Sequence, residues 1–128
     1  MKSLGILGFI LLVFQVAADL EKAGGNNALH KRGWNIAIFV LCEHQRGVLR
    51  CPGNMRLKIL QANYGRTDRF ICPKGPIRTT NCISSFSSRL IRYACDGRNA
   101  CLLDATNGVF GDPCVGTFKY IKIFYKCV

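Results

Sequence analysis

The sequence lacks most features that mark catalytic and metal-binding proteins. It has no Cys-x-x-Cys pair, and its only two histidines, His30 and His44, are not spaced as metal ligands. Structural zinc sites need closely spaced ligand pairs, so the absence of such pairs argues against zinc. No grouping of serine, histidine and an acid points to a catalytic triad, and sequence alone does not reveal a carboxylate pair. We therefore expect a protein that is not an enzyme and that holds no metal or other cofactor.

Acidic residues are scarce, and the basic residues that outnumber them form no run. The chain has 18 Lys and Arg against 7 Asp and Glu. A positive field of this kind favours acidic partners such as sulfated glycans, anionic bacterial surfaces, phospholipid headgroups or nucleic acid. Because the basic residues are scattered and there is no basic helix, we expect no nucleic-acid partner. A solvated basic surface explains the charge as well as a polyanion site does.

Long hydrophobic runs are also lacking, apart from one near the start. A lysine at position 2, the apolar or glycine run 4–13 and the small residues before Asp19 predict a secretory signal peptide over residues 1–18. A retained N-terminal anchor is the less favoured alternative. The run is too short to span a bilayer and no later stretch is long enough, so no membrane insertion is expected. The sequence thus predicts a secreted, extracellular protein.

Cysteine, in contrast, is abundant. The eight cysteines are Cys42, Cys51, Cys72, Cys82, Cys95, Cys101, Cys114 and Cys127. In an exported chain, an even number of cysteines predicts four disulfides. Their pairing does not follow from sequence, although Cys95 and Cys101 are close enough to form a small local loop. Without residues 1–18 the chain keeps 128 − 18 = 110 residues, which is the size of one domain.

Residue patterns divide the rest of the chain into strands, one helix and long loops. Residues 19–33 are polar and glycine-rich and predict a flexible basic N-terminal extension before a single domain at 34–128. Strand-like patterns occur at residues 34–42, 47–51, 55–65, 100–105 and 118–127. Residues 34–42 are apolar almost throughout, which predicts a buried strand.

The only helical pattern lies within residues 83–97. Phe86, Leu90 and Tyr93 or Ala94 recur at helical spacing, serines lie near the start, and Gly97 follows a plausible end. Residues 66–82 are rich in turn-forming residues and predict little regular structure. Together these elements predict a small disulfide-rich β or α+β domain.

Two charged residues lie at the ends of apolar segments. By strand parity, Lys119 falls on the same face as Ile121 and Ile123, which predicts a buried position. A lysine there must reach water, a carboxylate or a ligand. Glu43 likewise follows the apolar segment 34–42 directly. Polar groups at the rim of a core often form binding sites, so Lys119 and Glu43 are candidates for one. The structural alternative is a simple Lys–Glu pair or a lysine that reaches solvent.

Three segments, together with the order of the eight cysteines, resemble a known family. They are "CEHQ" (42–45), "ANYGR" (62–66) and "NGVFGDPCVGTFKYI" (107–121). They closely resemble the rhamnose-binding, or sea-urchin-egg-lectin-type galactose-binding, lectin domain, which also occurs in fish egg lectins and as an adhesion domain in latrophilin receptors. The resemblance covers about residues 40 to 128.

The resemblance implies a fold, a disulfide pairing and a binding site. The fold is an α+β domain in which antiparallel strands pack with short helices and long structured loops. The implied disulfides are Cys42–Cys72, Cys51–Cys127, Cys82–Cys114 and Cys95–Cys101. The family's sugar-contacting residues correspond to Glu43, Tyr64, Asn107, Asp112, Gly116 and Lys119. Tyr64 is expected to offer a surface to the sugar ring or to brace the loop, and Asp112 to contact sugar or to cap the Asp-Pro turn.

The resemblance also implies ligands and partners. We expect cell-surface or microbial glycans that carry L-rhamnose or D-galactose, bound without calcium, with innate immunity among the roles. All cysteines are accounted for, so an assembly would be a non-covalent homo-oligomer; the alternative is a monomer that does not agglutinate cells. Two other functions stay open: a protein-binding adhesion module, and a cationic defence protein that acts on anionic surfaces.

Overall fold

The structure is a computed structural model that describes residues 35–128. The predicted signal peptide at 1–18 and the predicted extension at 19–33 lie outside the described residues, as does Trp34. The chain separates into two units, of which the second is Ile36–Val128.

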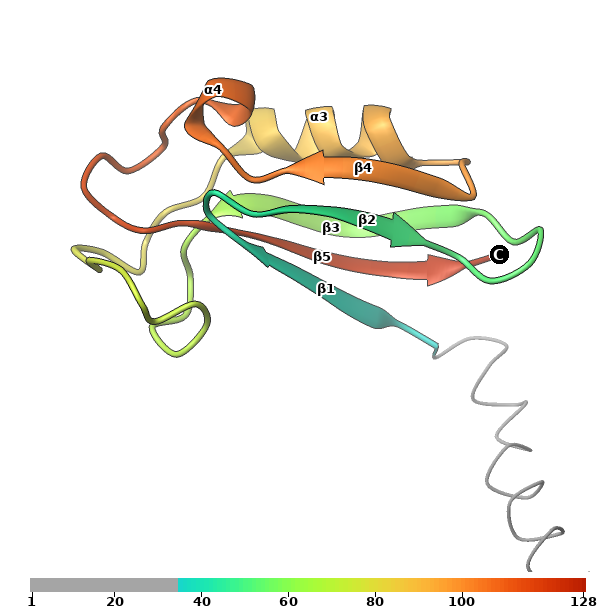
Figure 1. Ribbon diagram of the computed structural model, residues 1–128, viewed down its shortest axis with the longest axis horizontal. Helices are drawn as coiled ribbons and strands as arrows, with labels where there is room; N and C mark the ends of the chain where they lie inside the picture. Colours follow the sequence, from blue (N-terminus) through green and yellow to red (C-terminus); the bar gives the residue numbers. More distant parts are fainter. Residues whose placement is uncertain (1–34) are drawn as a thin grey trace, which may run out of the picture. The chain divides into compact units, whose positions relative to one another are not determined.

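This unit contains five strands and two helices (Figure 1). In chain order they are β1 (Ala37–Cys42), β2 (Arg46–Arg50), β3 (Leu57–Gly65), α3 (Ser85–Cys95), β4 (Ala100–Asp104), α4 (Asn107–Phe110) and β5 (Tyr120–Cys127). The strands form a three-stranded sheet in the order β1-β5-β3 and a two-stranded sheet of β2 and β4, and all pairings are antiparallel. With four disulfides, this architecture confirms the predicted disulfide-rich α+β class.

Strand β5 is the centre of the larger sheet and follows the predicted alternation. Ile121 and Ile123 are fully buried, whereas Lys122 on the other face lies over the ring of Phe124. Each strand residue points to the face opposite its neighbours, so this alternation directs the isoleucines into the core. The core cluster also draws apolar side chains from β2, β3, α3 and β4.

Strand β1 differs from its prediction. Its apolar run predicts a fully buried strand, but Ile38 and Val40 are 57% and 40% exposed. The reason is its place at the sheet edge, where it pairs with β5 alone and only one of its faces meets the core. Hydrophobicity in one sequence does not distinguish an edge strand from a central one.

Helix α3 lies where its pattern predicts, and Leu90 and Ala94 of the predicted face pack against the core, but the most buried positions lie one residue further along the chain. The buried residues are Ser87, Ile91 and Cys95, while Phe86 and Tyr93 are largely exposed. Ser87 is buried because its hydroxyl has two partners: it donates to the carbonyl of Ser84 and accepts from the backbone N–H of Tyr64. A buried hydroxyl with both bonds made carries little penalty, so a serine can occupy the face that packs on β3.

Four disulfides connect the strands, helix α3 and the long loops. They are Cys42–Cys72, Cys51–Cys127, Cys82–Cys114 and Cys95–Cys101, the same pairs that the resemblance implies. Residues 66–84 contain no helix or strand, only an isolated bridge between Arg66 and Cys82, as their turn-rich composition predicts.

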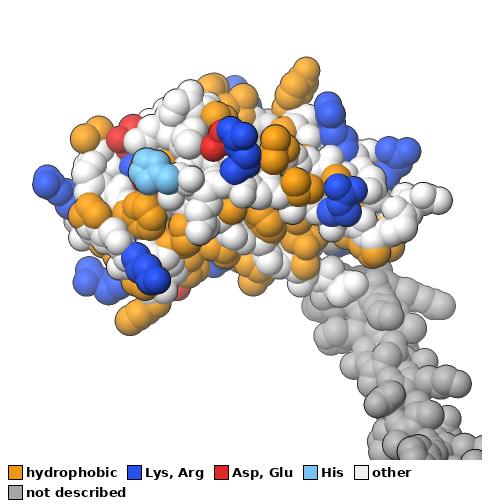
Figure 2. All heavy atoms as spheres, in the orientation of Figure 1, with side chains coloured by type: hydrophobic (Ala, Val, Ile, Leu, Met, Phe, Trp, Pro, Cys, Tyr) orange, Lys and Arg blue, Asp and Glu red, His pale blue; other side chains and the backbone are white. Residues whose placement is uncertain are grey.

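Basic side chains are spread over the surface rather than gathered. On the face drawn in Figure 2, Lys and Arg side chains lie singly or in small groups, separated by hydrophobic and uncharged atoms. This agrees with the absence of basic runs from the sequence.

Candidate functional site

The predicted site residues gather at one end of the domain, where loops connect the strands. We call this region the loop end; it comprises the turn at residues 43–45 and the segments 66–84 and 105–119 (Figure 1). The antiparallel register brings its two key charges together, because Cys42 lies opposite Tyr120. Glu43 and Lys119 therefore face each other just beyond the paired strands. The N–H of Glu43 donates to the carbonyl of Lys119 over 2.9 Å, and the N–H of Lys119 donates to Glu43 Oε1 over 2.8 Å.

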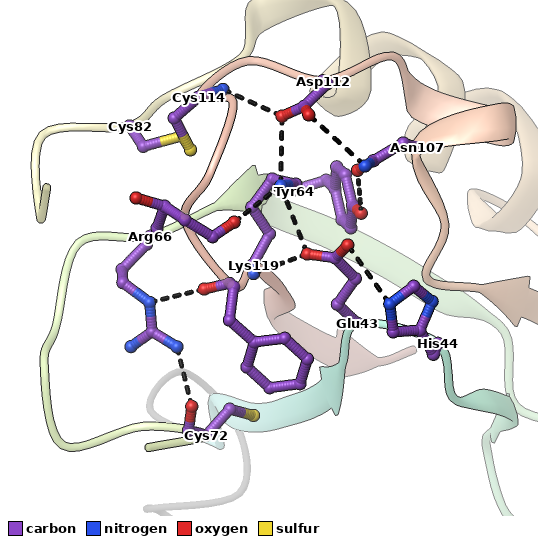
Figure 3. A network of polar contacts seen from close by, with 12 residues as sticks. Glu43, His44, Tyr64, Arg66, Cys72, Cys82, Asn107, Asp112, Cys114 and Lys119 are labelled. Carbon is purple, nitrogen blue, oxygen red and sulfur yellow. Dashed lines mark hydrogen bonds and ion pairs between the residues drawn. A yellow bond between two sulfur atoms is a disulfide. The ribbon is translucent and has the colours of Figure 1, made fainter. Parts of the chain in front are cut away.

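The ammonium of Lys119 is buried and fully hydrogen-bonded. Its side chain is only 2% exposed, and Nζ lies 3.2 Å from Glu43 Oε1 and 3.0 Å from Asp112 Oδ1. Its third partner is the carbonyl of Thr117, at 2.6 Å. A lysine ammonium has three N–H donors, so these three acceptors satisfy it. Figure 3 shows Lys119 pointing between the two carboxylates. The parity argument predicted the buried position and gave a carboxylate as one possible partner.

Asp112 both shapes its loop and faces the site. Its Oδ1 accepts from the backbone N–H of Cys114 over 3.2 Å, which closes the Asp-Pro turn, and also contacts Lys119. Its Oδ2 lies 3.4 Å from Nδ2 of Asn107. The two sequence-based alternatives for Asp112, a turn cap and a site residue, are therefore compatible.

Tyr64 is a brace rather than an open surface. Its side chain is fully buried and its ring stacks on Phe110, with centroids 5.0 Å apart. Its hydroxyl donates to Asn107 Oδ1 over 2.7 Å. Burial, together with the negative charges of Glu43 and Asp112, raises the pKa of Tyr64 far above its usual value. The hydroxyl thus stays a donor, and it turns the Nδ2 group of Asn107 toward Asp112.

A pocket of about 230 Å³ opens over these groups. It is lined by Glu43, His44, Pro76, Asn107, Asp112, Gly116, Thr117, Phe118 and Lys119. All the predicted site residues except Tyr64 contribute to its wall. Sequence reasoning did not single out His44 or Phe118, although both adjoin predicted residues.

Gly116 and His44 lie in backbone conformations that few residues adopt. Gly116 has φ of 86°, and a Cβ there would lie 3.0 Å from Arg78 Cδ, so both its conformation and its surroundings favour glycine. His44 has φ of 75° without being glycine, and its side chain is 75% exposed. Its Nε2 lies 3.5 Å from Glu43 Oε2, which places the imidazole at the mouth of the pocket.

Arg66 organises the loop end from beneath, a role that sequence reasoning missed. It is completely buried and donates to the carbonyls of Phe118, Asp68, Ile71 and Cys72 over 2.6 to 2.7 Å. Burial lowers the pKa of its guanidinium, while Tyr120 and Asp68 act in the opposite direction. The only signal in the sequence was its position in "YGR", directly after a strand and before a turn-rich segment.

One oxygen of each carboxylate and the amide group of Asn107 are left to face the pocket. Glu43 Oε1 is used by Lys119, but the one ion-pair contact of Oε2 among residues 35–128 is with His44, at 3.5 Å. Asp112 Oδ2 has a single long contact, with Nδ2 of Asn107. The formal charges of one ammonium and two carboxylates sum to −1. Such a site suits a ligand with adjacent hydroxyl donors.

Comparison with known proteins identifies the family to which the chain belongs. The family model for the D-galactoside/L-rhamnose binding SUEL lectin domain matches residues 49–127. The chain therefore belongs to the SUEL lectin-domain family, which is a carbohydrate-binding family and not a family of enzymes.

Individual relatives include both lectins and a receptor. The L-rhamnose-binding lectin ELEL-1 of Echinometra lucunter is 37% identical over 89 residues, which are 68% of this chain and 86% of that lectin. A rhamnose-binding lectin of Silurus asotus is 39% identical over 94 residues, which are 70% of this chain and 30% of the relative. The adhesion G protein-coupled receptor L1 of Bos taurus is 34% identical over 120 residues, 92% of this chain but 8% of the receptor. The chain thus spans less than a third of the length of the last two relatives.

Within the part of the chain that the structure describes, no helix is long and apolar enough to cross a membrane.

Proposed function

We propose that this protein is a secreted lectin that binds glycans carrying L-rhamnose or D-galactose on cell or microbial surfaces, without calcium. The observation that carries the proposal is the buried ammonium of Lys119 between Glu43 and Asp112. It lies beneath a pocket whose other polar groups can still form hydrogen bonds with a ligand.

The chemistry of a monosaccharide matches these groups. A pyranose presents adjacent hydroxyls, each of which is a donor and an acceptor. Glu43 Oε2 and Asp112 Oδ2 can accept from hydroxyls in charge-assisted bonds, which are stronger than neutral ones. Asn107 Nδ2 can donate to a hydroxyl oxygen. These groups are already fixed by Tyr64 and Lys119, so little ordering is needed when a sugar binds.

The position of Lys119 also supports binding without calcium. Calcium sites collect carboxylate and carbonyl oxygens around the ion. Here one oxygen each of Glu43, Asp112 and Thr117 is already bonded to the ammonium of Lys119. Lys119 is thus the cation that holds the two carboxylates in place.

Calorimetric titration of the oxidised protein in EDTA tests the proposal. We expect saturable binding of L-rhamnose and D-galactose and none of D-mannose. Glu43→Gln is expected to weaken binding about tenfold through loss of a charge-assisted bond. Lys58→Gln, a change at an exposed position on β3, is the matched control and should bind like the parent. A correctly disulfide-bonded protein that binds none of the sugars would contradict the proposal.

A protein-binding adhesion module is the second candidate. It is favoured by the similarity to the adhesion receptor, which extends over 92% of this chain. Such a module would keep its partner in the presence of free sugar and lose it only through substitutions outside the pocket. A cationic defence protein, in contrast, would lose binding as salt rises and keep it in Lys119→Ala.

Agglutination of cells requires more than one site per particle. A single shallow site binds a free sugar weakly, and multivalency is what raises the effective affinity. All eight cysteines are paired within the chain, so we propose a non-covalent homo-oligomer or a monomer that does not agglutinate. Light scattering during gel filtration distinguishes these, and a strict monomer that agglutinates would contradict this reasoning. A role in innate immunity stays a proposal that rests on microbial glycans as targets.

A further inference from the structure

A second hollow adjoins the proposed sugar pocket. It measures about 400 Å³ and is lined by Cys42, Glu43, Gln45, Cys72, Pro73, Lys74 and Phe118. Glu43 and Phe118 also line the first pocket, so the two hollows share a wall. A ligand that fills the first pocket and continues past Phe118 would therefore enter the second.

The walls of this second hollow are rigidly built. The disulfide Cys42–Cys72 joins the end of β1 to the loop, and Arg66 holds the carbonyls of Ile71 and Cys72. The loop is also fitted closely around Phe118. The N–H of Phe118 donates to the carbonyl of Pro76 over 2.7 Å, and a Cβ on Gly75 would lie 2.4 Å from Phe118 Cγ. The hollow is thus a defined feature of the fold, with Phe118 fixed at its boundary.

The chemistry of the second hollow differs from that of the first. Phe118, Pro73 and the disulfide offer apolar surfaces of the kind on which the C–H face of a pyranose packs. Gln45 uses Oε1 to accept from the N–H of Cys42, which leaves its amide NH₂ as a donor. Lys74 is exposed and forms no ion pair with any residue from 35 to 128. Glu43, on the shared wall, shares the ammonium of Lys119 with Asp112, whereas Lys74 is the cation of this hollow that has no carboxylate partner among residues 35–128.

We propose that this hollow is a second subsite, which takes the sugar linked to the terminal rhamnose or galactose and prefers an acidic sugar. The inference rests on the proposed function, because the terminal sugar must occupy the first pocket. Phe118 packs against the ring of the second sugar, and the ammonium of Lys74 pairs with its carboxylate. A free ammonium beside an apolar platform favours an anionic ring over a neutral one.

Matched pairs of disaccharides test the proposal by calorimetry at physiological ionic strength. The probes are L-rhamnosyl-galacturonate and D-galactosyl-glucuronate, each as the free acid and as its methyl ester, with methyl rhamnoside and methyl galactoside as references. The ester removes the charge and keeps the ring. We expect at least one acid to bind about tenfold more tightly than its reference, as one added charge-assisted bond predicts. We expect its ester to lose most of that gain.

Two variants separate a local contact from the general positive field of the protein. Lys74→Gln should reduce binding of the acid to that of the ester and leave monosaccharide binding unchanged. Lys58→Gln removes the same charge at an exposed position on β3 and should change neither. Equal binding of acid and ester by the parent protein, or equal losses in the two variants, would overturn the second subsite while monosaccharide binding stands. Absence of all monosaccharide binding would instead contradict the proposed function, and the subsite with it.

Discussion

The strands with helix α3 and the loop end are stabilised in different ways. Among the strands and α3 the core cluster is made almost wholly of apolar side chains such as Ile91, Ile121 and Ile123. The loop end buries Ala105 and Phe110 but also four charged or polar side chains, those of Arg66, Lys119, Glu43 and Thr117. Apolar burial is non-directional and tolerates small changes of shape, whereas a buried charge is stable only while its particular partners are present. The loop end should therefore be much more sensitive to the loss of a single polar group.

Replacement of Arg66 should have the largest effect. Arg66→Ala removes a buried guanidinium and its four hydrogen bonds, so four backbone carbonyls lose their donor. We expect a loss of about 4 kcal/mol in the free energy of unfolding, measured by urea denaturation with the disulfides intact. Arg66→Lys keeps the charge but not the geometry of the guanidinium, so it should recover little. A loss below about 1 kcal/mol in Arg66→Ala would show that the loops do not depend on this residue.

The stabilities contributed by an ion pair at the loop end and by one between the strands can be compared directly. Lys119→Met leaves the carboxylates of Glu43 and Asp112 without their buried cation. We expect the free energy of unfolding to fall by about 3 kcal/mol and sugar binding to be lost. Arg46→Met breaks the pair with Asp104 between β2 and β4, where Arg46 is 68% exposed, and should cost about 0.5 kcal/mol. Urea denaturation measures both. Similar losses in the two variants would remove the distinction between the regions.

A conservative change in the apolar core should lower stability but spare the site. Ile123→Val deletes one methylene from a fully buried side chain, and we expect a loss of about 1 kcal/mol. Calorimetric titration should give an unchanged affinity for L-rhamnose. A marked loss of affinity would mean that the site depends on core packing as well as on its own polar contacts.

A change at Tyr64 should affect sugar binding more than stability. Tyr64→Phe keeps the stacked ring on Phe110 and removes only the hydroxyl that donates to Asn107. We expect a loss of at most about 1 kcal/mol in stability, yet about a fivefold loss of affinity for L-rhamnose because the carboxamide is released. The converse result, an unstable protein with full affinity, would show that Tyr64 is a core residue without a role in the site.

The sequence predicts those features that depend on local periodicity. The alternation in 121–127 places Ile121 and Ile123 in the core, and the same parity buries Lys119. The exposed face of β1 and the buried Ser87 escaped prediction, because both depend on which elements pack nearby. A single sequence does not carry that information in its pattern.

Motif resemblance supplied the residues of the candidate site but not their arrangement. Motif resemblance named Glu43, Asn107, Asp112 and Lys119, which the structure brings together around one ammonium. It gave no role to Arg66, whose acceptors lie in three separate loop positions and near the start of β5. Contacts between one side chain and the backbone carbonyls of irregular loops leave no periodic signal.

The most direct test of a preformed sugar site at the loop end is a two-dimensional amide NMR titration of the oxidised protein with L-rhamnose in EDTA. The account predicts saturable shifts confined to residues 43–45 and 107–119, with no change in β2, β4 or the exposed face of β1, and no response to D-mannose. Shifts spread over the strands, or an absence of shifts at the loop end with L-rhamnose and with D-galactose, would contradict it.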